Sequence, residues 1–183
     1  MDDPLRDRHP PREWAAATQV IEISEKIRCF EQLATVIEAD LIALDAAKIP
    51  AGWRDLMLTG TLEYGFADGQ EDVAALEISL AAEITAVCQR CLQPFSFTVA
   101  TSPRELFSGP ADELEKREGY ELWEYSEEPM RPLDIAEEAL IMAMPLSAMH
   151  DNMNECVDID VIEVDERMTT PFANLRSQMD DEK

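Results

Sequence analysis

Apolar residues occupy alternate positions through the middle of the chain, which is the pattern of β-strands. From Leu76 to Cys88 every second residue is apolar, and the alternation resumes at Phe95 and runs to Val99. A period of two places such residues in one row on one face of a sheet. The intervening residues end in Pro94, which does not fit the interior of a sheet, so they predict a hairpin turn between two strands.

Another strand is expected before this hairpin. Leu58, Leu62 and Tyr64 fall on one face of an extended segment, and residues 67–72 have the polar, glycine-containing composition of a turn. The pattern therefore predicts an antiparallel meander with strands near 56–66, 73–87 and 95–107.

Two helices are expected on either side of this meander in the sequence. Ser24 precedes apolar residues that recur three and four positions apart, which predicts an amphipathic helix near 25–45 with Ser24 as its cap. Residues 133–144 follow a proline, carry acids in their first turns and stop at Pro145, as a second helix would. We predict an α+β fold in which the meander packs against both helices.

The rest of the chain divides into shorter pieces. Residues 1–14 are polar and rich in proline, so we expect a mobile N-terminal segment before a single domain over residues 15–166. Within that domain, residues 19–23 and 120–125 each predict a short strand.

The last residues, 167–183, are predicted to form a C-terminal tail with a short docking helix. Phe172 and Leu175 share one side of that helix. They are expected to dock on the domain or on another protein.

Two cysteines at the predicted hairpin tip give the chain its most distinctive chemistry. Cys88 and Cys91 have the spacing of one half of a zinc site, and His150 and Cys156 lie close together after the second helix. Zinc takes four thiolate or imidazole ligands in a tetrahedron, often as two pairs from separate loops. These four residues are therefore candidate zinc ligands.

Two other interpretations of the thiols stay open from spacing alone, namely reduced cysteines without metal and a redox dithiol. A thioredoxin-like pair opens a helix, whose N-terminus lowers the thiol pKa, whereas this pair leads into Pro94 and a strand. The redox interpretation is the weaker one. Cys29, beside the apolar stripe of the first helix, is expected to be a small buried residue.

Charge and composition exclude several classes of function. The 183 residues include 39 acidic and 15 basic ones, a formal net charge of -24. Such a surface repels phosphate and attracts basic proteins, so extensive nucleic-acid binding is disfavoured. No apolar run approaches the ~20 residues of a membrane span, and the N-terminus lacks the order of a signal peptide, so we expect a cytosolic protein that does not enter a membrane. No catalytic set or phosphate-binding loop stands out, and we expect neither enzymatic activity nor a small-molecule substrate.

One small non-acidic surface is expected near the thiols. If the first turn of the meander centres near Gly69, Trp53 and Arg54 lie at the same end of the sheet as Arg90. An aromatic ring and two arginines there form a candidate partner-binding surface, for the apolar rim of a basic protein or for a local contact with one phosphate. A capped sheet end with Trp53 in the core is the other interpretation.

Taken in order, these motifs resemble those of the YceD family. The resemblance covers roughly residues 20 to 178 and rests on the segments 88–92, 133–145 and 150–151, on Cys156, and on 171–175. It implies a cytosolic bacterial or plastid protein that is needed for normal accumulation of 23S ribosomal RNA, and so for large-subunit biogenesis, without known enzymatic activity.

Three functional hypotheses follow. The first is a factor whose acidic surface holds a basic ribosomal protein or ribosome assembly factor. The second is a protein that touches rRNA locally through the surface of Trp53, Arg54 and Arg90. The third, the alternative outside the ribosome, is a cytosolic zinc-binding or thiol-redox protein.

Overall fold

The structure, a computed structural model, describes residues 3–67, 73–108, 119–124 and 128–156. Its helices and strands are, in chain order, α1 (Pro11–Ala16), β1 (Val20–Lys26), α2 (Glu31–Leu41), β2 (Met57–Phe66), β3 (Ala74–Val87), β4 (Pro94–Thr101), β5 (Arg104–Ser108), β6 (Glu121–Glu124) and α3 (Pro132–Ala143). Short 3₁₀ turns add η1 (Ile27–Cys29), η2 (Ala46–Lys48), η3 (Trp53–Asp55) and η4 (Met153–Glu155). No helix in these ranges is long and apolar enough to cross a bilayer.

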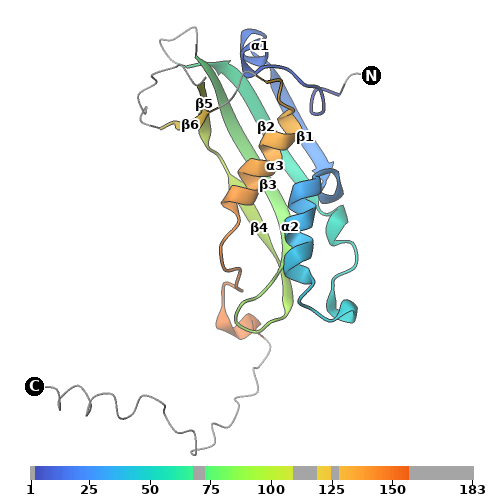
Figure 1. The fold of residues 1–183 in the computed structure, drawn as a ribbon. Coiled ribbons are helices and arrows are strands. Elements are labelled where there is room, and N and C mark those ends of the chain that lie inside the picture. The colour runs from blue at the N-terminus through green and yellow to red at the C-terminus, as the bar shows by residue number, and fades with distance from the viewer. Residues whose placement is uncertain (1–2, 68–72, 109–118, 125–127, 157–183) are drawn as a thin grey trace, which may run out of the picture.

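One six-stranded sheet forms the framework (Figure 1). The long strand β3 pairs antiparallel with β2 on one side, and with β4 and then β5 on the other. This arrangement confirms the predicted meander and the α+β class. β1 adds to β2 antiparallel, and β6 adds to β5 in parallel.

The two longer helices cover one face of this sheet (Figure 1). Alternate residues of β3 from Leu76 to Ala86 are buried under them, while Glu77, Ser79 and Glu83 on the other face are exposed. The helices add Leu33, Ile37, Ile135 and Leu140 to the same core. Period-two strands and amphipathic helices thus bury their apolar sides against each other.

The first long helix begins later than the sequence pattern indicates. Residues 24–26 continue β1, where Ser24 pairs with Thr59 of β2, and α2 starts only at Glu31. The prediction of Ser24 as the helix cap is therefore wrong. Ladder hydrogen bonds to β2 hold these residues in a strand, although the apolar spacing alone is compatible with a helix.

A carboxylate from the other helix replaces the missing cap. Phe30 precedes α2 and offers no side-chain acceptor, so its first N–H groups need another partner. Glu137 of α3 is only 2% exposed, and its Oε1 accepts a hydrogen bond of 2.8 Å from the backbone N–H of Leu33. This contact joins α2 to α3 and places negative charge at the positive end of the α2 dipole.

Removing this acceptor should destabilise the fold. Glu137→Ala leaves the Leu33 N–H unpaired beneath α3, and we expect a loss of about 2–3 kcal/mol in the free energy of unfolding. Glu137→Gln keeps a carbonyl oxygen at the same place and should lose less. Urea denaturation of the two variants gives both values, and equal losses would show that the hydrogen bond is not the source.

The N-terminal residues pack against the domain. Leu5 is buried, and its carbonyl accepts a hydrogen bond from the N–H of Leu133 at the start of α3. His9 and Met130 form an isolated antiparallel bridge. Here an apolar side chain and backbone groups find partners that a local composition does not reveal, and the mobility of residues 1–14 stays a prediction. The predicted tail and docking helix over 167–183 lie outside the described residues.

Gly60 lies where β2 and β3 approach each other closely. It faces Leu80 in the β2–β3 ladder and has a φ of +153°. A Cβ added there would lie 2.8 Å from Leu80 Cα and even closer to the Ser79 carbonyl oxygen. Only a residue without a side chain fits this backbone.

Candidate metal centre

The β3–β4 turn brings two thiols together. The Cys88 N–H donates to the Gln93 carbonyl at 2.9 Å, and the Leu92 N–H donates to the Cys88 carbonyl at 2.8 Å. Leu92 has a φ of +55°, a left-handed conformation that is uncommon outside glycine and reverses the chain here. The hairpin predicted from the alternating pattern is confirmed, with Cys88 and Cys91 at its tip.

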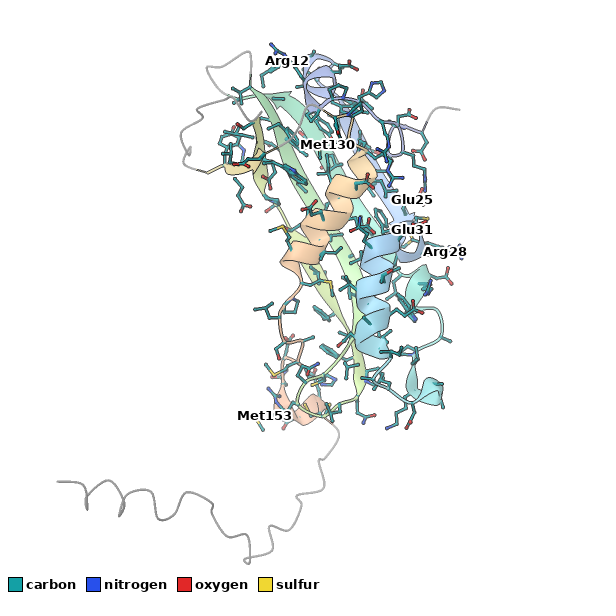
Figure 2. The ribbon with its side chains drawn as sticks, in the orientation of Figure 1. Arg12, Glu25, Arg28, Glu31, Met130 and Met153 are labelled. Atoms are coloured by element: carbon teal, nitrogen blue, oxygen red, sulfur yellow. The ribbon has the colours of Figure 1, made fainter. Side chains whose placement is uncertain are left out.

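A second segment reaches this tip from the end of α3. After α3 the chain continues to the β3–β4 end of the sheet (Figure 1), where the Gln89 N–H donates to the Ala148 carbonyl at 2.9 Å. The turn η4 then places Cys156, and Met153 marks this end of the molecule in Figure 2. Backbone pairing between two distant segments therefore builds the site.

The four predicted ligands meet at this point. Cys88, Cys91, His150 and Cys156 each offer one ligand atom, and these atoms lie within 4.8 Å of one another. His150 Nδ1 is 3.6 Å from Cys91 Sγ and 3.6 Å from Cys156 Sγ. Ligands at roughly 2.0–2.3 Å from a tetrahedral zinc are separated by roughly 3.5–3.8 Å, so the set fits that ion.

The charge of the cluster also favours a cation. Burial alone would raise the pKa of the Cys88 thiol, but backbone N–H groups of the turn and of His150, with the His150 ring, donate hydrogen bonds that lower it to about 5. Burial raises the pKa of the Cys156 thiol, and the neighbouring thiols raise it further against a hydrogen bond from Arg90. The protein alone thus accommodates a thiolate at Cys88 more easily than at Cys156. A divalent ion would supply the charge that lets both ionise.

Neighbouring side chains hold the ligands in place. The Phe95 ring packs against His150, with 4.5 Å between centroids, and the Arg90 guanidinium donates to Cys156 Sγ at 3.7 Å. Cys88 is 0% exposed, so the centre is closed on the protein side. Four protein ligands leave no coordination position for a substrate, which is the arrangement of a structural zinc site and not of a catalytic one.

The geometry of the turn disfavours the redox interpretation of the thiols. The pair Cys88 and Cys91 lies between two strands, and no described helix starts there to activate a dithiol. The remaining thiol, Cys29, lies apart and donates to Glu25 Oε2 at 3.3 Å. It is half-buried in η1, not in the helix where the sequence pattern puts it.

The predicted partner-binding residues are divided between two places. Arg54 pairs with Glu38 of α2 at 2.8 Å, and its guanidinium lies 4.8 Å from the Trp53 ring centroid. Arg90 instead lies on the thiol turn, near Cys156 and Met149. Trp53 packs half-buried at the edge of the core, and no contact within the described ranges joins it or Arg54 to Arg90.

One anchor of the site is not evident from the sequence pattern. Asp40 Oδ2 accepts a hydrogen bond of 2.7 Å from the Val87 N–H, directly before Cys88. The residue lies between apolar positions of α2, and an acidic residue there is usually a solvated one. Its partner becomes visible only once α2 is placed across the end of β3.

Comparison with known proteins gives a family match that spans these residues. The model of the YceD family, described as large ribosomal RNA subunit accumulation protein YceD, matches residues 76–177, more than half of the 183 residues. The match begins in β3 and includes all four residues of the cluster. No match was found among curated proteins or among solved structures. The chain therefore belongs to the YceD family.

Proposed function

We propose that this protein supports the accumulation of 23S ribosomal RNA, and hence large-subunit biogenesis, as a non-enzymatic factor that binds a basic ribosomal protein or assembly factor. The observation that carries this proposal is the family match, because the family is described by large-subunit rRNA accumulation. The closed cluster of four ligands supports a structural centre and thus a binding protein.

The charge distribution supports a protein partner. Many basic side chains in the described ranges already face a carboxylate, which leaves the acidic excess on the surface. These pairs are Arg6–Asp3, Lys26–Asp55, Arg28–Asp55, Arg54–Glu38, Arg104–Glu77 and Arg131–Asp134. A surface of this kind speeds encounters with a basic protein and repels RNA backbone.

Zinc is the ion that we assign to the thiol cluster. Bound there, it would clamp the hairpin tip to the segment after α3. This clamp would hold Arg90 and the neighbouring surface in one conformation for a partner. The assignment is structural, and no chemical step passes through the ion.

Affinity purification from cells tests the proposal. We expect the tagged full chain to retain basic ribosomal proteins or assembly factors at low ionic strength, and to release most of them at moderate ionic strength because exposed charges are screened. Cells without the protein should contain less large-subunit rRNA relative to small-subunit rRNA. Normal rRNA levels in those cells would contradict the ribosomal role, and a complex indifferent to salt would contradict the charge argument.

The same purification also distinguishes binding of a basic protein from a second candidate function, a local contact with rRNA. The exposed Arg54 stacked on Trp53 supplies a cation and an aromatic face, and Arg90 beside the thiol cluster supplies a second cation at a separate place. With ultraviolet crosslinking before lysis, rRNA crosslinks that Arg90→Glu removes would favour this candidate. Crosslinks that are absent, or unchanged in the variant, would leave protein binding as the mode of action.

A further inference from the structure

An acidic cavity lies at the opposite end of the sheet from the thiol cluster. It has a volume of about 230 Å³ and lies between the β5–β6 edge and α3. Glu105 and Leu76 are paired in the ladder, and Leu76 is eleven residues from Val87 at the thiol turn, or about 36 Å of strand. The residues that line the cavity include Glu105, Glu121, Trp123, Glu124, Glu138 and Met142.

Strand register explains why the carboxylates meet. Glu105 pairs with Leu76 of β3, so its side chain points to the face that the helices cover. Glu121 of β6 lies directly beside Glu105 in the parallel β5–β6 ladder and shares that face. Glu138 lines the cavity from α3 above them. Like charges on adjacent strands repel each other, so the arrangement destabilises the free protein.

Glu105 is the most unusual member of this group. It is only 8% exposed, and no described residue forms a hydrogen bond or ion pair with its carboxylate. Burial raises its pKa, and the charges of Glu121 and Glu138 raise it further. A carboxylate on a largely buried residue, with no cation among the described side chains beside it, is costly, and such groups are normally paired.

No described basic residue neutralises it. Its neighbour Arg104 points to the opposite face of the sheet, where it pairs with Glu77 and lies 4.5 Å from the Tyr120 ring centroid. A metal ion fits less well, because among the described side chains only the thiol cluster gathers its ligand atoms closely enough for one. The cavity instead combines spread carboxylates with an indole and a thioether. This combination suits a flat, extended cation.

We propose that this cavity receives an arginine side chain of the basic protein partner, with the guanidinium beside Glu105, Glu121 and Glu138 and against the Trp123 indole. The partner assignment rests on the proposed function, whereas the cavity and its chemistry do not. Guanidinium pairs with carboxylates through several N–H donors and stacks on aromatic faces, so it matches both parts of the lining. Met142, 76% exposed at the rim, adds apolar surface for the rest of the partner.

Titration of the full chain with N-acetyl-arginine amide tests the site. Followed by NMR, backbone amide signals of β5, β6 and α3 should shift, and the uncharged N-acetyl-citrulline amide, of nearly the same shape, should leave them in place. Glu105→Gln, which keeps the shape of the side chain, should raise the Kd for arginine amide about tenfold or more. Glu138→Gln, at an exposed position of α3, gives a second variant that does not disturb the buried residue.

Glu83→Gln is the matched control. It removes the same charge from an exposed position on the opposite face of the sheet, and we expect less than about a twofold change in Kd. If the control weakens binding as much as Glu105→Gln does, a diffuse field attracts the ligand and the site is overturned. Equal shifts with citrulline amide would also overturn it.

A third outcome of the titration would assign the cavity to a basic side chain of this same protein and not to a partner. The sequence between β5 and β6 contains Lys116 and Arg117. If arginine amide binds only after both are changed to alanine, the cavity belongs to these residues, and the partner proposal is wrong. The titration contains no ribosomal component, so a failure of the proposed function, seen as normal rRNA levels in cells without the protein, is distinguished from a failure of the site.

Discussion

Cys88→Ser should abolish stoichiometric zinc binding and give the largest functional loss of any single substitution in this chain. Cys88 is fully buried between the hairpin and the segment that carries His150 and Cys156, so its loss removes a ligand and opens the clamp. We expect zinc content, measured by elemental analysis after gel filtration, to fall from about one ion per chain to about zero. The free energy of unfolding should fall by about 3–5 kcal/mol, measured by urea denaturation.

Cys29→Ser is the control for this experiment. This thiol lies outside the cluster and bonds to Glu25, so the substitution should leave zinc content unchanged. Treatment with a chelator should reproduce the destabilisation of Cys88→Ser in the wild-type chain and should not affect the Cys88→Ser variant. Full zinc content in Cys88→Ser, or its absence from the wild-type chain purified without chelator, would refute the metal assignment.

Gly60→Ala should be the most damaging substitution in the sheet. The new methyl group would meet the backbone of β3 at Ser79 and Leu80, and backbone atoms cannot rotate away as a side chain does. We expect a loss of at least about 3 kcal/mol in the free energy of unfolding, enough to leave much of the chain unfolded at 37 °C if the domain has ordinary stability.

Gly65→Ala provides the comparison within the same strand. A Cβ at Gly65 meets no atom within 4 Å, and its φ lies outside the left-handed region. Its free energy of unfolding should change by less than about 1 kcal/mol. Circular dichroism during thermal unfolding ranks the two variants, and equal destabilisation would contradict the close approach of β2 and β3 at Gly60.

The central strands and the thiol pairs could be predicted because each leaves a local signal. Alternation from Leu76 to Cys88 fixes both the strand and its buried face, and Pro94 marks where the next strand begins. The spacing of Cys88 and Cys91 is that of one half of a zinc site. That His150 and Cys156 complete it was an inference from residue type, and the structure adds the backbone contact between Gln89 and Ala148 that makes it possible.

The features that could not be predicted depend on partners distant in the sequence. Ser24 has the residue type of a cap, but the β1–β2 ladder determines its conformation, and Glu137 caps α2 from 104 residues away. Glu105 is another case, because an acidic residue in an acidic stretch is normally solvated. Its burial follows only from the register of β5 against β3 and from the position of α3.

The separation of the two ligand pairs along the chain would determine how the proposed zinc ion couples to folding. Cys88 and Cys91 enclose only two residues, so an unfolded chain could already capture zinc with these two thiols. His150 lies 59 residues beyond Cys91 and would join only when α3 has docked. Closing a loop of that length costs the unfolded chain about 4 kcal/mol of free energy at 25 °C, through lost conformational entropy, in the simplest polymer treatment. Occupancy of the first two ligands would therefore report the presence of zinc, whereas occupancy of all four would report that the chain has finished folding.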